Sequence, residues 1–388
     1  MSEFRRFDPS LCHFPRPGVP PLPVLQWSEL GRGAGASAHA LDEPAGGHFF
    51  SRGRYALHAA YGAAGVGPGG ALLAPAYHCR TMLDPALALN GAVALYRVRA
   101  DLTPDLADIA ALVDGSRIPV KALVMPHYFG FEQPAQLTLE LAALCHSRGI
   151  MLIEDCSHAW PVALARAALC RDAPNHAVVA SPYKYFACAD GGVLWGAARR
   201  GCDRALVSAG WLRELAAARS MLAQLRAAPA PTLEGSAHSA TPCGAEITES
   251  SDQPSRLYDR ASEGRRGLAL SRWVIGRSSS AAIAHKRRAN YARWLDAVAP
   301  LAAGRALFAT VPSDCAPYMF PLVINTPESH FFKLKQLAMP IYRWDEMAVS
   351  DCAVASRYRL ALLHLPCHQS LSEQQMQWMI SVVTEVLQ

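Results

Sequence analysis

The stretch that decides the fold reads SPYK at residues 181–184 and continues with DGG at residues 190–192. The apolar residues 177–180 just before it predict a short buried strand, so Lys184 follows the end of a strand. Reactive groups of α/β folds often lie at such ends. A surface cation is the commoner role of a lysine, but lysine is scarce in this chain and apolar runs flank this one. A desolvated lysine has a lowered pKa, and its neutral amine can form a Schiff base.

A second strand end supports the first. Residues 150–153 form an apolar run that leads into Glu154 and Asp155. A carboxylate at the end of a buried strand needs a cationic partner, because its unpaired burial costs on the order of several kcal/mol. A protonated pyridinium nitrogen is one such partner, and a lysine aldimine with an aspartate beneath the ring is the arrangement of pyridoxal phosphate (PLP) enzymes. Alternatively Asp155 caps the next helix. Lys184 and Asp155 alone leave both roles of Asp155, cofactor partner and helix cap, open.

Composition narrows the class of protein. The chain has 388 residues, 51% of them hydrophobic, which suffices for two domains with a sizeable core. Its net charge of +5 is spread out, and no aromatic-basic motif indicates nucleic acid binding. The 11 cysteines form no CxxC pair and no metal-like spacing, so we expect reduced thiols in a cytoplasmic protein without a metal site. We see no signal peptide and no membrane span.

Strands and helices alternate through the first half of the chain. Such alternation predicts a mostly parallel sheet flanked by helices. Functional groups should cluster at the strand ends, where Tyr77, His127, Asp155 and Lys184 lie. The expected strands are residues 71–74, 93–98, 122–125, 150–153, 177–180 and 193–195.

The chain divides into four expected parts. Residues 1–48, rich in Pro, Gly and Ala, form an N-terminal arm, and residues 49–226 form the large domain. Residues 227–255 are a flexible insertion or linker. Residues 256–388 form a smaller C-terminal α/β domain, with a strand at 318–324 and a helix at 373–386. Its first arginines form either a solvated face or a site for an anionic substrate.

A helix is expected to begin at Gly53 and Arg54. Free backbone N–H groups, the helix dipole and the guanidinium can hold a phosphate at such a helix start. An ordinary helix start is the commoner meaning of the same residues.

These motifs together resemble the DegT/DnrJ/StrS-type aminotransferases. These are PLP enzymes of fold type I, and many act on keto-sugars attached to nucleotides. The resemblance covers residues 49 to the C-terminus, apart from residues 227–254. Its motifs are GR at 53–54, PAY at 75–77, PHYFG at 126–130, IEDCSHA at 153–159, K at 184 with DGG at 190–192, RRANY at 287–291 and LPCH at 365–368.

The resemblance implies a role for several residues. Lys184 would carry the Schiff base and shuttle the proton, while Asp155 would pair with the pyridinium nitrogen. His158 would lie against the ring near its phenolic oxygen. The ligands of the cofactor phosphate would be Gly53, Arg54 and Ser181.

The sequence also departs from the family pattern. The family usually has Thr where Arg54 stands, and it usually places an aromatic residue for ring stacking near Cys79. Here Tyr77 or His78 would have to stack on the ring. The family's Gly-rich segment is replaced by residues 160–166, so the cofactor side looks retained and the substrate side altered.

We therefore expect a PLP-dependent aminotransferase that moves an amino group from an amino acid donor to a carbonyl acceptor such as a nucleotide-linked keto-sugar. Elimination or decarboxylation on the same fold, or a non-catalytic PLP-binding regulator, are the alternatives. The resemblance implies a homodimer that shares its sites. We expect substrate contacts from His127 and, across the interface, from Arg272.

Overall fold

The structure is a computed structural model that describes residues 2–8, 12, 14–30, 46–171, 173–200, 206–226 and 245–388. Most of the predicted linker, residues 227–244, lies outside the described residues. The same holds for residues 31–45 of the predicted arm.

A seven-stranded sheet forms the large lobe. Its strands β3 to β7 are parallel, whereas β8 and β2 join one edge antiparallel. The parallel strands are apolar and mostly buried on both faces, as expected for a sheet covered by helices. The predicted fold class is confirmed. In sheet order the strands are β2 (His48–Phe50), β8 (Gly192–Gly196), β7 (His176–Ala180), β6 (Met151–Asp155), β5 (Val120–Pro126), β3 (Ala71–Pro75) and β4 (Ala92–Tyr96).

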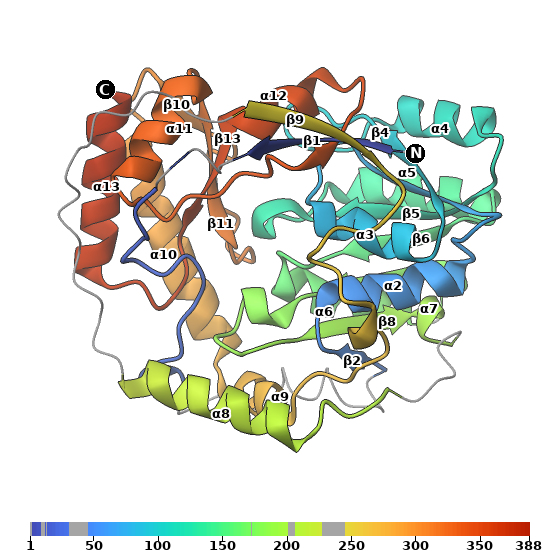
Figure 1. Cartoon of the computed structure of the whole chain (residues 1–388), viewed down its shortest axis with the longest axis horizontal. Coiled ribbons are helices and arrows are strands. Elements are labelled where there is room, and N and C mark those ends of the chain that lie inside the picture. The colour runs from blue at the N-terminus through green and yellow to red at the C-terminus, as the bar shows by residue number, and fades with distance from the viewer. Residues whose placement is uncertain are drawn as a thin grey trace.

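Helices cover both faces of this sheet (Figure 1). The helix α2 packs against α3, α7 and the strands β7 and β8, and its buried residues Ala56 and Ala60 belong to a core cluster shared with these strands. The lobe contains α2 (Gly53–Ala64), α3 (Arg80–Ala88), α4 (Leu106–Gly115), α5 (Ala135–Ser147), α6 (Trp160–Cys170) and α7 (Ala197–Arg200).

A smaller lobe lies beside the large one (Figure 1). Its antiparallel sheet has the order β10 (Gly304–Ala306), β11 (Met319–Ile324) and β13 (Leu362–Pro366). The long helix α10 (Ser280–Val298) begins after Ser279, whose side chain accepts a hydrogen bond from the Ala282 amide and caps the helix. The other helices are α8 (Trp211–Arg226), α9 (Ala269–Arg277), α11 (Pro327–Gln336), α12 (Ala353–Ala361) and α13 (Glu373–Leu387).

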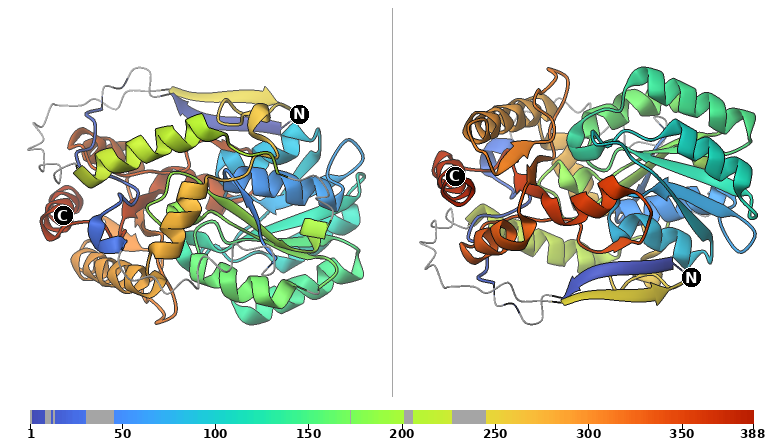
Figure 2. Two further views of the ribbon diagram at one scale, coloured as in Figure 1. Left: turned by 90° about the horizontal axis from the view of Figure 1, so that it is seen from below. Right: turned by 90° about the horizontal axis from the view of Figure 1, so that it is seen from above.

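The N-terminus and the predicted linker contribute to a third sheet. The strand β1 (Ser2–Asp8) pairs with β9 (Ala245–Ser251) and with β12 (Met347–Ala348), all antiparallel. Figure 2 shows β1 and β9 side by side along one edge of the molecule. Phe4 is buried there beneath the guanidinium of Arg80, which lies 3.3 Å from the ring centre. Part of the predicted linker is therefore an ordered strand.

The parallel strands place the candidate site. Pro126, Asp155 and Val179 lie at matching register positions near the carboxyl ends of β5, β6 and β7. The chain then leaves β7 through the short 3₁₀ helix η5 (Pro182–Lys184). No helix among the described residues is long and apolar enough to span a membrane.

Candidate active site

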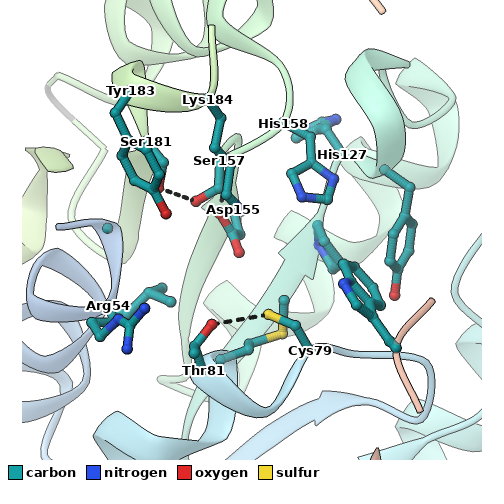
Figure 3. Close-up of a pocket in the computed structure, with 16 residues that line it drawn as sticks. Arg54, Cys79, Thr81, His127, Asp155, Ser157, His158, Ser181, Tyr183 and Lys184 are labelled. Carbon is teal, nitrogen blue, oxygen red and sulfur yellow. Dashed lines mark hydrogen bonds between the residues drawn. The ribbon is translucent and has the colours of Figure 1, made fainter. Parts of the chain in front are cut away.

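A cavity opens at the carboxyl ends of β5, β6 and β7, and Lys184 and Asp155 both line it (Figure 3). Its walls come from the start of α2, the start of α3, the strand ends and one residue of the smaller lobe, Trp344. The other lining residues are Gly53, Arg54, Leu57, Cys79, Thr81, Met82, Pro126, His127, Tyr128, Ser157, His158, Ser181 and Tyr183.

The amine of Lys184 faces this cavity without a hydrogen bond or ion pair to any described residue. Its nitrogen lies 5.5 Å from the ring centre of Tyr318. Burial lowers the pKa of Lys184, but electrostatic interactions, with Tyr183 the strongest and with Tyr318, Cys79 and Asp155 after it, outweigh burial and raise the pKa. The expected lowering of this pKa is therefore wrong.

The carboxylate of Asp155 is 6% exposed and forms no salt bridge with a described residue. One of its oxygens accepts a hydrogen bond from the Ser157 amide at 2.9 Å. The helix α6 begins after Ala159, which has no side-chain cap, so Asp155 does not cap it. The helix-cap alternative is therefore wrong, and a carboxylate oxygen remains available to the cavity.

The imidazole of His158 lies between the cavity and the aromatic side chains behind it. Its ring stacks on Tyr318 with ring centres 4.3 Å apart. Its Nδ1 accepts a hydrogen bond from the Phe129 amide at 3.3 Å. Burial lowers the pKa of His158 well below its usual value, with a further contribution from the Lys184 charge. The ring is therefore neutral, and its proton lies on Nε2, which can donate to a ligand.

The start of α2 forms a narrow cradle against Ser181. A Cβ atom on Gly53 would lie 2.1 Å from the Ser181 oxygen, so only glycine fits here. The first amides of the helix, on Gly53 and Arg54, have no intrahelical acceptor. The Ser181 hydroxyl donates to the Ser157 hydroxyl at 2.9 Å. These amides and hydroxyls suit a phosphate dianion.

The side chain of Arg54 lines the cavity, and its guanidinium donates to the carbonyl of Leu257. A backbone carbonyl neutralises no charge, so the guanidinium keeps its attraction for an anion.

Tyr77 and His78, predicted to stack on the ring, do not line the cavity among the described residues. The Tyr77 ring packs on Trp344 with centres 4.9 Å apart, and its hydroxyl hydrogen-bonds His364 Nε2 at 3.0 Å. His78 is fully buried; its Nδ1 donates to the Cys79 carbonyl and its Nε2 accepts from the Ala348 amide. Burial lowers the pKa of His78 to about 4. Cys79, with Thr81, instead lines this wall of the cavity.

His127 lines the cavity, but both of its ring nitrogens are already engaged. Its Nδ1 accepts from the Gln133 amide at 3.0 Å, and its Nε2 donates to buried Glu154 at 2.8 Å. Burial raises the pKa of Glu154, but hydrogen bonds from His127, His176 and Arg166 outweigh it and lower the pKa. His127 thus stabilises a buried carboxylate by a hydrogen bond, and no ring nitrogen is left for a substrate.

The smaller lobe supplies residues that the sequence did not single out. Trp344 completes the wall beside His158, and the ring of Tyr318 stacks on His158 and lies near the Lys184 amine. Arg272, the predicted substrate residue on α9, is not among the described residues that line the cavity. Trp344 and Tyr318 lie far in sequence from the strand motifs, which explains why no local pattern indicated either residue.

The buried guanidinium of Arg287 fixes the turn that carries Lys184. Its five N–H donors all have carbonyl acceptors, and burial lowers its pKa. The bonds join α10 to η5 and to the chain just before β11. The acceptors are Gln369 Oε1 at 3.0 Å and the backbone oxygens of Pro317 at 2.9 Å, Tyr318 at 3.2 Å, Lys184 at 3.1 Å and Tyr185 at 3.1 Å.

The charges and hydrogen-bonding groups around the cavity match those that PLP needs. The cavity places a lysine amine, an aspartate oxygen and a neutral histidine N–H around one space, with the phosphate cradle at one end. Lys184 and Asp155 carry opposite charges but form no salt bridge with each other. A group that is cationic at one atom and an aldehyde at another complements both.

Comparisons with known proteins agree with this geometry. Residues 49–200 match the sequence model of the DegT/DnrJ/EryC1/StrS aminotransferase family. This segment contains Gly53, Asp155, His158, Ser181 and Lys184, so the predicted family resemblance is confirmed for the residues that build the site. With it the predicted cofactor, PLP, and the predicted enzyme class, an aminotransferase, are confirmed. No curated protein sequence matches the chain.

Solved structures share the whole fold at low sequence identity. The sugar aminotransferase CalS13 from Micromonospora echinospora is 16% identical, with a TM-score of 0.57 over 95% of this chain and 99% of that chain. PseC from Helicobacter pylori, an aminotransferase involved in pseudoaminic acid biosynthesis, is 13% identical, with a TM-score of 0.57 over 92% of each chain. NtdA from Bacillus subtilis, solved with bound PMP, is 13% identical, with a TM-score of 0.57 over 92% of this chain and 78% of that chain.

Proposed function

Taking residues 49–200 as a DegT/DnrJ/EryC1/StrS-type aminotransferase segment, we propose that the protein transfers an amino group from an amino acid to a nucleotide-linked keto-sugar. One observation carries the proposal: the Lys184 amine and the Asp155 carboxylate share one cavity, and neither is paired with another side chain. A structural ion pair would have joined them. The sugar aminotransferase CalS13, which shares this fold, supports the class of acceptor.

PLP, when bound, supplies an electron sink for the bond that breaks at the donor's Cα atom. Asp155 holds a proton on the pyridine nitrogen, which keeps that sink strong. His158 donates its Nε2 proton toward the phenolic oxygen. The amides of Gly53 and Arg54, with the Ser181 hydroxyl, hold the phosphate.

Lys184 moves the proton. Its nitrogen removes the proton from the donor's Cα atom once it is neutral. The neighbouring Tyr318 ring and the fixed η5 turn limit where this nitrogen can lie.

The test is borohydride reduction of the purified protein with PLP, followed by peptide mapping. We expect a yellow protein with the label on Lys184, and no fixed label in Lys184→Ala. A label on another lysine, or none, would contradict the assignment.

Glutamate added to the untreated enzyme distinguishes the reactions. Transamination converts it to 2-oxoglutarate, decarboxylation releases carbon dioxide, and a non-catalytic regulator leaves it unchanged. Only the first outcome supports an aminotransferase that uses glutamate as its donor. If glutamate stays unchanged, other amino acids are tested as donors in the same way.

We further propose a homodimer that shares its active sites, as the family resemblance implies. Arg272 lines no part of its own chain's Lys184 cavity, so its proposed substrate contact would be made in the other subunit. Nearby, α8 and α9 expose Trp211, Leu212 and Trp273 by 73%, 64% and 47%, an apolar surface that a second copy can cover.

A mixing experiment tests this shared site. Lys184→Ala and Arg272→Ala, each inactive alone, are combined under conditions of subunit exchange. A mixed dimer contains one intact site, so part of the activity should return. A monomer by light scattering, or no recovery after proven exchange, rejects the shared site.

A further inference from the structure

A second cavity adjoins the one that contains Lys184. It has a volume of about 520 Å³, and Arg54 lines both cavities. This volume lies within the usual range for small-molecule sites. Four arginines line it, from the start of α2, the start of α8 and the chain after β9, and we call it the arginine cavity. They are Arg52, Arg54, Arg213 and Arg256.

The charges of these arginines are not balanced within the cavity. Asp190 is the one acidic residue among its described lining residues, and both of its oxygens accept from the Leu268 amide at 3.2 Å. Burial raises the pKa of Asp190, whereas the charge of Arg52 lowers it, so Asp190 offsets part of the charge of Arg52. No salt bridge joins any of the four arginines to a described carboxylate. Four cations with a single carboxylate among them still repel one another, and an anion between them would reduce that cost.

Ser51 adds a neutral polar group to the same wall. Its hydroxyl oxygen is buried and has no hydrogen-bond partner among the described residues. A buried hydroxyl without a partner is costly, and a ligand oxygen would satisfy it.

The arginine cavity and the Lys184 cavity share part of their walls. Arg54 lines both, and the guanidinium of Arg52 lies 4.4 Å from the ring centre of Tyr183, which lines the first cavity beside Lys184. In Figure 1 the chain after β9 runs past α2 toward α9, and it brings Arg256 to this place. A single extended molecule can therefore have one end at Lys184 and the other among the arginines.

We propose that the arginine cavity binds a phosphate or diphosphate group of the acceptor substrate. This inference rests on the proposed function, because the phosphate group belongs to the same acceptor molecule whose carbonyl group reacts at Lys184. Guanidinium groups bind phosphate oxygens bidentately, and a diphosphate offers enough oxygens and charge for several of them. A single carboxylate, such as that of an amino acid donor, would leave most of the four cations unbalanced.

The test measures binding of pyrophosphate by calorimetry to the PLP-loaded enzyme, in which the cofactor's own phosphate fills the cradle at Gly53. The variant Arg213→Gln/Arg256→Gln removes two exposed arginines of the cavity. Arg219→Gln is the matched control, because Arg219 is exposed on the same helix as Arg213 but does not line the cavity. Glutarate, a dicarboxylate, and inorganic phosphate serve as competing anions, and the visible spectrum reports any loss of cofactor.

We expect pyrophosphate to bind more tightly than phosphate or glutarate. Each lost guanidinium should weaken it about tenfold, so the double variant should bind about a hundredfold more weakly while the control is unchanged. Equal affinity in the double variant and the control, or glutarate binding as tightly as pyrophosphate, overturns the inference. If borohydride leaves no label on Lys184, the proposed function fails, and the same titration still tests the arginine cavity by itself.

Discussion

Arg287 donates a hydrogen bond to the backbone oxygen of Lys184 and does not line the cavity, yet it should control how well Lys184 is held. The change to make is Arg287→Lys, which keeps the positive charge. A lysine has three donors on a compact head, whereas the arginine presents five in a planar fork. At least two of the five carbonyl acceptors around Arg287 must therefore lose their donor.

The size of the effect follows from those acceptors. A buried carbonyl left without its donor costs about 1–3 kcal/mol, so two such losses cost about 2–6 kcal/mol. A domain of ordinary stability has about 5–15 kcal/mol in total, and Arg287→Lys should still fold. Removing the side chain altogether, as in Arg287→Met, would orphan all five acceptors and also leaves no cation there.

Urea unfolding measures the stability, and Arg288→Lys is the control. Arg288 is the next residue, is half-buried and makes one hydrogen bond, to the Cys315 carbonyl at 3.0 Å. We expect its replacement to cost less than about 1 kcal/mol. A second readout separates positioning from plain stability: the pH profile of visible absorbance reports the environment of the Lys184 amine. This profile should shift in Arg287→Lys and not in Arg288→Lys.

Equal stability and equal absorbance profiles in Arg287→Lys and Arg288→Lys would contradict the role of Arg287. A loss of stability with an unchanged absorbance profile would also reject the positioning role, because Arg287 would then support only the packing of α10.

Three further predictions follow from the site. Asp155→Asn should retain PLP but slow the half-reaction with an amino acid donor by about a hundredfold or more, as measured by stopped-flow absorbance, and a near-normal rate would reject its role. Gly53→Ala should lower the melting temperature and the affinity for PLP, because the added methyl would lie 2.1 Å from the Ser181 oxygen; Gly53→Ala/Ser181→Ala should regain part of the melting temperature, and no recovery would argue against this clash. Burial raises the pKa of Glu29 to about 7, so its protonated form favours the folded state. This stabilisation is present at low pH and is lost as the pH rises through about 7; Glu29→Gln should gain about 2 kcal/mol more at pH 8 than at pH 5, and a pH-independent gain would show that Glu29 ionises normally.

The sequence predicted what is local in the structure. The strand runs and the residues directly after them are consecutive in the chain, so periodicity located Lys184, Asp155 and the start of α2 within a few residues. The motif order was enough to place Gly53, His158 and Ser181 in the same cavity.

Side-chain direction was harder to predict. Tyr77 and His127 follow the ends of β3 and β5, and Asp155 is the last residue of β6, but only Asp155 faces the cavity with a free polar group. Tyr77 points into the aromatic cluster, and His127 uses both nitrogens for Gln133 and Glu154. The position of a residue after a strand does not reveal such partners.

Contacts between distant segments were missed altogether. β1 pairs with β9 over more than 200 residues of chain, and neither segment has a strong apolar alternation of its own. Trp344 and Arg287 reach the site from the smaller lobe in the same way. No local pattern marks a residue whose role depends on a segment a hundred residues away.

The backbone and the side chain of Arg54 can serve two different ligands. In the usual family pattern a threonine stands here, and its hydroxyl can serve the cofactor phosphate. In this chain the Arg54 amide remains in the cradle at the start of α2, whereas the guanidinium reaches the Leu257 carbonyl and lines the arginine cavity. The backbone can therefore keep its part in binding the cofactor while the side chain faces a different ligand. This is how the cofactor side of the site can stay close to the family pattern while the substrate side departs from it.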